Sequence, residues 1–155
     1  MLINREIAAD FCAELKKNNK IVFTNGCFDI IHAGHVRYLT AAKNFGDILI
    51  VGLNTDESVQ RLKGNSRPIN NQNDRAEVLL GLKAVDYVIL FGEQTAEALI
   101  AEIKPDIYVK GGDYTLETLP EAKIVQSYGG RIELINLVAG KSTTNIVERI
   151  LTRFK

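Results

Sequence analysis

The chain has 155 residues, of which 46% are hydrophobic, and its 19 basic and 19 acidic side chains cancel to a formal net charge of zero at pH 7. This length is typical of one domain with a sizeable core, so we predict a single domain over residues 1–155. A balanced charge excludes the uniform positive field that holds nucleic acids or anionic membranes, and any anion site must therefore be local.

The apolar pattern alternates along the chain between the periods of strands and helices. Residues 5–17 place Ile7, Phe11 and Leu15 at i, i+4 and i+8, which is the stripe of an amphipathic helix. Runs rich in Val, Ile and aromatic residues, bounded by Gly, Asp or Asn, predict five strands. These runs lie at residues 20–25, 47–53, 85–91, 106–112 and 131–137. Helical patterns lie between and after them, at residues 35–46, 55–64, 73–83, 95–104, 119–130 and 142–154.

This order of elements predicts an α/β fold. Strands with little two-fold alternation indicate a parallel sheet that is covered on both faces. We therefore expect a Rossmann-like domain with a five-stranded parallel sheet and helices on both faces. Ligands of such sheets bind beyond the carboxyl ends of the strands, which makes the strand exits the places to search for a site.

The first strand exit, residues 24–35, reads TNGCFDIIHAGH and holds both histidines of the chain. His32 and His35 are three residues apart around a predicted helix start near Ala33, so both rings can face one side of the first turn. Gly26 lets the backbone come close to a bound group. The free N–H groups and the positive dipole of a helix start favour phosphate binding, and two ring N–H donors would strengthen that binding.

Two other interpretations of the histidine pair stay open at this point. A metal site would need a third ligand and usually an i, i+4 spacing, and the sequence offers neither. A structural pair, which only caps the helix or satisfies the core, is the usual role of an isolated histidine. The flanking glycines and the nearby aspartate favour the phosphate interpretation.

The long irregular stretch at residues 63–74, KGNSRPINNQND, is polar and contains Pro68, so it predicts a loop. A loop of this length inside a compact domain is more often functional than accidental. Arg67 and Arg75 could bind phosphate as planar forks. Asp74 could be only the N-cap of the helix that follows.

Two later segments add charges and hydroxyls at strand exits. After the fourth predicted strand, Gly111 and Gly112 let backbone groups approach a flat base, while Lys110 and Asp113 offer one charge of each sign. Residues 142–144, Ser-Thr-Thr, open the last predicted helix. A plain N-cap explains one of these three hydroxyls, so we favour phosphate binding by this segment.

Membrane and disulfide signals are weak in this sequence. No apolar run approaches the roughly 18 residues that a membrane-spanning helix needs, and the opening MLINREIAADF lacks the apolar core of a signal peptide. Cys12 and Cys27 come with no Cys-x-x-Cys or His-rich spacing. We therefore expect a cytoplasmic protein with reduced thiols, without a protein-built metal site, and with neither nucleic acid nor membrane as a partner.

A family resemblance rests on GCFDIIHAGHVRYL, residues 26–39, which resembles the G-x-F-D-x-x-H-x-G-H signature of the cytidylyltransferase-like nucleotidyltransferases. Over nearly all of its length the chain is similar to the heptose 1-phosphate adenylyltransferases of lipopolysaccharide precursor synthesis, through VGLNTDESVQRLKG, RPINNQNDRAEVL, YVKGGDY and GKSTTNIVERI. The resemblance implies transfer of AMP from ATP, carried with Mg²⁺, to D-glycero-β-D-manno-heptose 1-phosphate, giving ADP-heptose and pyrophosphate. It also implies a homodimer. Because no kinase-sized segment is present, we expect a free-standing enzyme that works in sequence with a separate heptose kinase.

The same resemblance implies roles for the residues at the strand exits. The catalytic residues would be His32, His35 and Lys63. The nucleotide would be bound by Asn25, Gly26, Cys27, Phe28, Lys110, Gly111, Gly112, Asp113, Ser142, Thr143 and Thr144. The sugar phosphate would be bound by Asp29, Arg67 and Arg75.

Two residues of this set have other interpretations. Asp29 is an acidic residue among phosphate ligands, and it could orient a neighbouring cation, help to hold Mg²⁺ or cap the helix. Cys27 occupies the variable place in the signature and reads as a spacer, because no base or cation is predicted beside it.

Two other functions fit the same motifs. One is a cytidylyltransferase that acts on glycerol 3-phosphate or a similar alcohol phosphate. The other is a module that binds a nucleotide without chemistry, since binding loops alone do not prove turnover.

Overall fold

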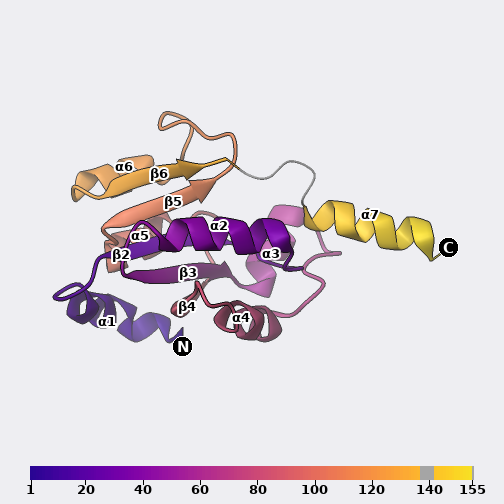
Figure 1. The fold of residues 1–155 in the computed structure, drawn as a ribbon, viewed down its shortest axis with the longest axis horizontal. Helices are drawn as coiled ribbons and strands as arrows, with labels where there is room; N and C mark the ends of the chain where they lie inside the picture. Colours follow the sequence, from indigo (N-terminus) through magenta and orange to yellow (C-terminus); the bar gives the residue numbers. More distant parts are fainter. Residues whose placement is uncertain (137–141, 155) are drawn as a thin grey trace.

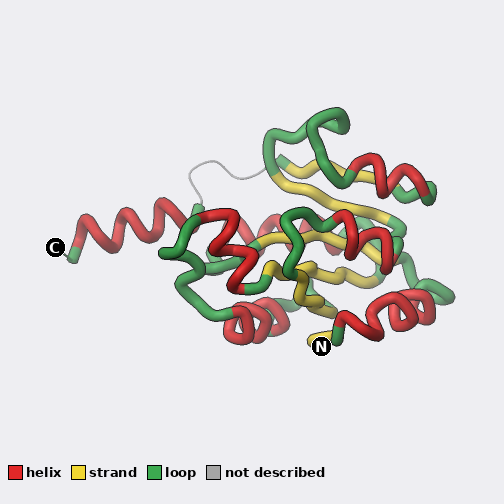
Figure 2. Tube along the Cα trace, turned by 180° about the vertical axis from the view of Figure 1, so that it is seen from behind, coloured by secondary structure: helices red, strands yellow, loops and turns green. Residues whose placement is uncertain are grey.

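The computed structural model describes residues 1–136 and 142–154, and these form a six-stranded parallel sheet between two layers of helices (Figures 1 and 2). The strands pair in the order β1-β4-β3-β2-β5-β6. They are β1 (Leu2–Ile3), β2 (Ile21–Gly26), β3 (Ile48–Asn54), β4 (Tyr87–Phe91), β5 (Ile107–Gly111) and β6 (Arg131–Ile135). The fold class is as predicted, and the order places β2 and β5 side by side near the centre of the sheet.

The prediction of five strands is wrong by one, because it misses β1. This strand has two residues and lies at the sheet edge, where Leu2 is opposite Val88 and Ile3 is opposite Ile89. A run of two residues is too short to show a strand period. The last predicted strand ends in the structure at Ile135, and Leu137, which the prediction included, lies outside the described residues.

The helices lie in the predicted segments, except that α2 begins two residues and α4 one residue before its predicted segment. They are a 3-10 turn η1 (Arg5–Ile7) and the helices α1 (Ala8–Leu15), α2 (Ala33–Lys43), α3 (Asp56–Lys63), α4 (Gln72–Leu80), α5 (Glu97–Ile103), α6 (Ala122–Ser127) and α7 (Thr143–Arg153). The side chains of Thr55 and Asn71 cap α3 and α4. The alternative interpretation of Asp74 as the N-cap of α4 is therefore wrong. Asn71 begins that helix by accepting from the backbone N–H of Asp74, and its own amide donates to the Asp74 carboxylate.

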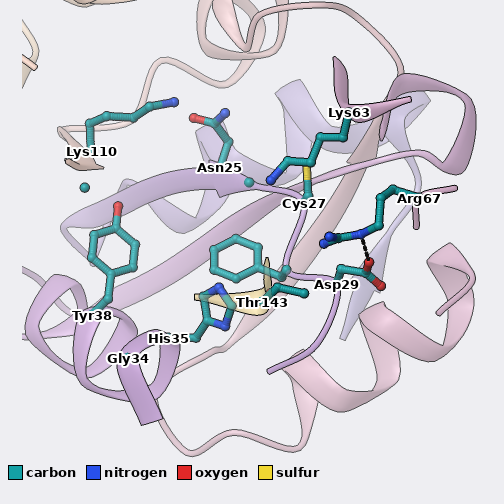
Figure 3. A pocket seen from close by; sticks show the side chains of 13 residues that line it. Asn25, Cys27, Asp29, Gly34, His35, Tyr38, Lys63, Arg67, Lys110 and Thr143 are labelled. Atoms are coloured by element: carbon teal, nitrogen blue, oxygen red, sulfur yellow. Dashed lines mark hydrogen bonds and ion pairs between the residues drawn. The ribbon is translucent and has the colours of Figure 1, made fainter. Parts of the chain in front are cut away.

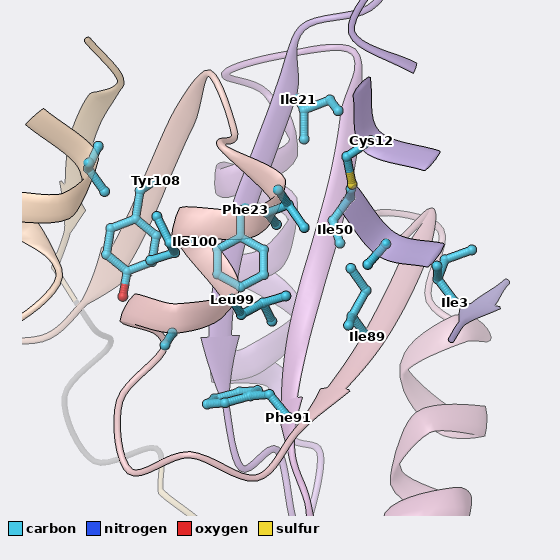
Figure 4. Packing of buried hydrophobic residues seen from close by; sticks show 14 of the residues in the cluster. Ile3, Cys12, Ile21, Phe23, Ile50, Ile89, Phe91, Leu99, Ile100 and Tyr108 are labelled. Carbon is cyan, nitrogen blue, oxygen red and sulfur yellow. The ribbon is translucent and has the colours of Figure 1, made fainter. Parts of the chain in front are cut away.

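The core has two parts, one on each face of the sheet. Cys12, Phe23 and Ile100 belong to the part under α1, α5 and α6, which Figure 4 shows. Val22 and Leu39 belong to the part under α2 and α4. Neighbouring residues of β2 therefore point into different parts, and both are fully buried, which is why the strands read as unbroken apolar runs.

The last helix, α7, extends beyond the rest of the molecule (Figures 1 and 2). None of its residues, all of which are described, is buried, and Ile150, Leu151 and the following Phe154 are exposed. Within the described residues, no helix is both long and apolar enough to cross a membrane.

Candidate functional site

A cavity of about 310 Å³ opens at the carboxyl ends of β2 and β5, between the first turn of α2, the end of α3 and the start of α7 (Figure 3). It lies where ligands of parallel α/β sheets bind. Lys63 and Arg67 lie on one side of it, and Lys110 and Tyr38 lie on the other. The lining residues are Asn25, Gly26, Cys27, Phe28, Asp29, Gly34, His35, Tyr38, Lys63, Arg67, Lys110, Gly111 and Thr143.

Most of the predicted site residues meet in this cavity. Within the described part of the chain, the lining leaves out six of them, which are His32, Arg75, Gly112, Asp113, Ser142 and Thr144. The cavity adds Tyr38, which sequence reasoning missed. Its position three residues after His35 on α2 is the signal that could have found it, because residues at i and i+3 share a helix face.

The two histidines form a reciprocal cap at the start of α2. His32 is the N-cap, and its Nδ1 accepts from the backbone N–H of Gly34 at 3.1 Å. The Nδ1 of His35 accepts from the backbone N–H of His32 at 3.4 Å. The rings stack with their centroids 3.9 Å apart. Because each Nδ1 is an acceptor, each neutral ring carries its proton on Nε2, and His35 presents an N–H donor.

His35 is held neutral by its surroundings. Burial, followed by the Coulombic effects of His32 and of Lys63, lowers the pKa of His35 from 6.5 to about 4. Its contribution to a bound anion is therefore a hydrogen bond from a neutral ring. The positive charge of the cavity comes from the lysines and Arg67.

Phe28 forms part of the cavity through an unusual backbone conformation. Its φ is 43°, in the left-handed region, which costs about 1–3 kcal/mol for a residue with a side chain. The ring is buried edge-on against His35, with centroids 5.3 Å apart. A Cβ on Gly26 would lie 2.9 Å from the ring atom Cε2, so only glycine leaves room for it there.

Asp29 fixes the loop between α3 and α4. Its carboxylate, which is buried, accepts from the backbone N–H groups of Ile69 and Asn70 and from Arg67 Nε at 2.7 Å. Burial alone would raise the pKa of Asp29, but the hydrogen bonds from Asn70, Ile69 and Arg67 outweigh it and hold that pKa below its usual value. Of the interpretations left open by the sequence, the geometry matches the orientation of a neighbouring cation, which is Arg67.

Arg75 does not reach the cavity. It is 1% exposed, and its guanidinium donates to the carbonyl oxygens of Asn70 and Cys27 and to the carboxylate of Asp56. All three nitrogens are engaged, so the prediction that Arg75 contacts a substrate has no support in this geometry. The residue instead ties α4 to the exit of β2 and to the start of α3.

The hydroxyls at the start of α7 have three different surroundings. Ser142 caps the helix by accepting from the backbone N–H of Asn145. Thr143 lines the cavity and donates to the carbonyl oxygen of Ile30 at 3.3 Å. Thr144 is exposed outside the cavity lining. One of the three predicted phosphate ligands thus faces the cavity.

At the exit of β5, too, some of the predicted residues line the cavity and others do not. Lys110 and Gly111 line the cavity, and Gly112, with a φ of 119°, turns the chain away, so that Asp113 is exposed outside it. The prediction that Gly112 and Asp113 contact the nucleotide is not supported by their positions. Cys27 faces the cavity, but burial raises the pKa of its thiol, which agrees with a spacer.

The described residues do not fit a metal held by the protein alone. Among residues 1–136 and 142–154, no group of three or more His, Cys, Asp or Glu side chains could hold an ion. Asp29 is the acidic residue of the described cavity lining, and both of its oxygens already accept hydrogen bonds. A Mg²⁺ ion here would need ligands from elsewhere, such as the oxygens of a polyphosphate.

Relatives of known sequence match the chain closely. It is 53% identical over 152 residues to the bifunctional protein HldE of Pelobacter propionicus. This match covers 97% of this chain and 31% of that protein. It is 58% identical over 133 residues to the bifunctional protein HldE of Pseudomonas fluorescens, covering 86% and 28%. The chain thus spans less than a third of the length of these relatives.

Solved structures show the same fold. The lipopolysaccharide core biosynthesis protein from Thermoplasma volcanium is 32% identical, with a TM-score of 0.63, over 78% of this chain and 98% of that one. The pantoate-β-alanine ligase from Francisella tularensis shares the fold alone, at 15% identity and a TM-score of 0.64, over 99% and 79%. The sequence profile described as cytidylyltransferase-like matches residues 23–149. On the signature around the two histidines, the cavity and this match, the chain belongs to the cytidylyltransferase-like family.

Proposed function

We propose that the chain transfers AMP from ATP to D-glycero-β-D-manno-heptose 1-phosphate, giving ADP-heptose and releasing pyrophosphate. The observation that carries the proposal is the cavity that gathers His35, Lys63, Arg67 and Lys110 at the carboxyl ends of the central strands. The similarity to the HldE proteins and to the lipopolysaccharide core biosynthesis protein of T. volcanium supports this choice of substrate.

The reaction needs positive charge and position more than it needs a base. The nucleophile is a phosphate oxygen of the sugar phosphate, which is largely ionised near neutral pH because its second pKa is about 6. It attacks the α-phosphorus of ATP, the bond to the bridging oxygen breaks, and pyrophosphate leaves with the electron pair. A neutral His35 suits this chemistry, because its role is to donate a hydrogen bond and not to take a proton.

The chain's own residues bring two polyanions together. Lys63 and Arg67, on one side of the cavity, and Lys110, on the other, offset the repulsion between the phosphates. His35 Nε2–H points its donor at charge that develops on the α-phosphoryl oxygens. His32, which caps α2 and stacks on His35, would hold that ring in place.

A substrate screen tests the proposal. Each of ATP, CTP, GTP and UTP is mixed with heptose 1-phosphate, glucose 1-phosphate and glycerol 3-phosphate, and pyrophosphate release is measured. We expect release from ATP with heptose 1-phosphate above all other pairs. Release from CTP with glycerol 3-phosphate would replace the proposal by the alcohol-phosphate cytidylyltransferase. ATP binding without release from any pair would replace it by the non-catalytic module.

Mg²⁺ belongs to the proposal as the partner of ATP. Since the described residues form no cage for it, the ion would bind through the triphosphate oxygens and neutralise part of their charge. We expect excess chelator to abolish pyrophosphate release, and added Mg²⁺ to restore it. Full activity in chelator would contradict this part of the proposal.

The assembly and the cellular setting are proposals on the family resemblance alone. We propose a cytoplasmic homodimer that receives its sugar phosphate from a separate heptose kinase. Light scattering at several protein concentrations tests the dimer, and a strict monomer would remove it.

A further inference from the structure

A buried carboxylate lies behind the cavity without a full set of partners. Glu121, the residue before α6, is 3% exposed, and among the described residues its Oε2 has no hydrogen-bond partner. Its Oε1 accepts from the backbone N–H of Ala96 at 3.4 Å, which helps to cap α5. That contact accounts for one oxygen only. A buried charge is costly unless it is paired, so the carboxylate needs a cation nearby.

The nearest cation is a residue of the cavity. Lys110 Nζ lies 3.9 Å from Glu121 Oε1, and 5.6 Å from the ring centroid of Tyr114. The Lys110 side chain is 17% exposed, so this pair is less screened by water than a surface pair. The ammonium therefore stands between the buried carboxylate and the open cavity.

Tyr108 connects the same face of β5 to the cavity by a hydrogen bond of its own. Tyr108 and Lys110 are two residues apart on β5 and share one face of the sheet, the face that α6 covers. The Tyr108 hydroxyl donates to Asn25 Oδ1 at 2.7 Å, and Asn25 lines the cavity. Burial raises the pKa of Tyr108, and the negative charge of Glu121 raises it further. Because the one hydroxyl proton of Tyr108 is donated to Asn25, this hydroxyl does not also donate to Glu121.

We propose that Glu121 is a positioning residue of the nucleotide site. Its carboxylate attracts the Lys110 ammonium, which lies 3.9 Å from Oε1, and so positions the cation that the end of β5 presents to the ligand. The inference rests on the proposed function in taking ATP as that ligand. It adds a residue that lies outside the signature and outside the cavity lining.

The test is a double-mutant cycle on ATP binding. Glu121→Gln keeps the shape and can still accept from Ala96, but it removes the charge. We expect it to raise the Kd and the KM for ATP about tenfold, with kcat changed less than about twofold. In the Lys110→Met background the same change should add less than about twofold, because the two residues act through one contact.

Two further measurements separate an effect on the position of the Lys110 ammonium from an effect on the stability of the fold. Asp86→Asn breaks the ion pair with Lys43 ahead of β4, at the far ends of the strands, and should lower the melting temperature without changing ATP affinity. The NMR signal of the Lys110 ammonium in the ligand-free protein should shift in Glu121→Gln. This signal does not depend on turnover, so it decides the inference even where the wild type releases no pyrophosphate.

Three results would overturn the inference. Unchanged ATP affinity with a lowered melting temperature would leave Glu121 as a cap of α5 only. Additive effects in the cycle would separate it from Lys110. Tighter ATP binding would show that the carboxylate merely repels the polyanion. Should Glu121→Gln not fold, Glu121→Asp tests the same contact, because the shorter side chain draws the carboxylate away from Lys110. We then expect weaker ATP binding, and unchanged affinity would contradict the inference.

Discussion

His35 faces the cavity as a neutral imidazole with its Nε2–H free to donate, and two predictions follow from that state. His35→Ala should leave the fold intact and lower turnover by about 10²-fold, the usual loss when one donor to the transition state is removed. Pyrophosphate release at saturating substrate measures it. Thr40→Ala, an exposed position on the same helix, is the control and should keep the wild-type rate. A His35→Ala rate equal to wild type would end the assigned role.

The lowered pKa of His35 also predicts a pH dependence of stability. Its pKa is 6.5 in the unfolded chain and about 4 in the folded one, so the unfolded state takes up a proton first as the pH falls. The wild type should therefore lose stability from this group between about pH 6.5 and pH 4, and should not lose it above pH 6.5. His35→Gln should escape that loss. Urea unfolding of both proteins at pH 7.5 and 4.5 measures it, and an equal fall in both would contradict it.

Single residues show how much of the candidate site could be predicted from the sequence. Residue types at the exits of β2 and β5 pointed to His35 and Lys110, and the family resemblance pointed to Lys63; all three line the cavity. Arg75 was misplaced, because a guanidinium fork can donate to carbonyl oxygens and carboxylates as well as to phosphate, and only its burial tells these roles apart. Glu121 could not be foreseen, because it lies ten residues beyond the strand exit that it serves and no local pattern marks it.

At the scale of elements, the loop between α3 and α4 depends on one carboxylate. Asp29→Asn would set an amide group against the backbone N–H groups of Ile69 and Asn70 and would remove the charge that pairs with Arg67. We expect the free energy of unfolding to fall by about 2–3 kcal/mol, since the group is buried and its bonds are charge-assisted. Urea unfolding measures this change.

The matching surface pair is the control for that prediction. Glu14, near the end of α1, forms an ion pair with Lys17 just beyond the helix, with side chains 72% and 65% exposed, and Glu14→Gln should change stability by less than about 0.5 kcal/mol. An Asp29→Asn variant as stable as Glu14→Gln would show that the loop does not depend on Asp29.

The packing of β3 against β2 gives another prediction. A Cβ on Gly52 would lie 2.6 Å from Phe23 Cζ inside the core, so Gly52→Ala must displace that ring and should cost about 1–3 kcal/mol. Gly81→Ala, at the end of α4 with a φ of −74° and ordinary contacts, should be neutral or stabilising by up to about 1 kcal/mol. Thermal unfolding of both variants decides it, and equal melting temperatures would contradict the argument.

Element positions were the most predictable part of the fold. The helix α1 is recognised by its apolar period and the strand β3 by its unbroken apolar run, and cap residues such as Thr55 mark helix starts. The edge strand β1 has no such pattern, because its place depends on pairing with β4, far along the chain. Asn71 and Asp74 are both good caps, and the local sequence alone does not choose between them.

At the scale of the whole molecule, the parallel sheet explains why the site is where it is. Helices cover both faces, so the sheet leaves its strand ends free, and the carboxyl ends of β2 and β5 lie next to each other. Residues from position 25 to position 143 meet there. Their meeting could be expected from the topology, but which of them face the cavity could not, because that depends on turns such as the one at Gly112.

The position of the C-terminal helix, α7, is energetically coupled to ligand binding in the cavity. Its first residue, Thr143, lines the cavity and donates to Ile30, while the rest of α7 contributes nothing to the buried core. By reciprocity, a ligand that gains from contact with Thr143 must also favour the docked helix. Protection of the first turn of α7 against hydrogen exchange should thus rise with saturation by ATP. This protection would therefore report whether the nucleotide is bound.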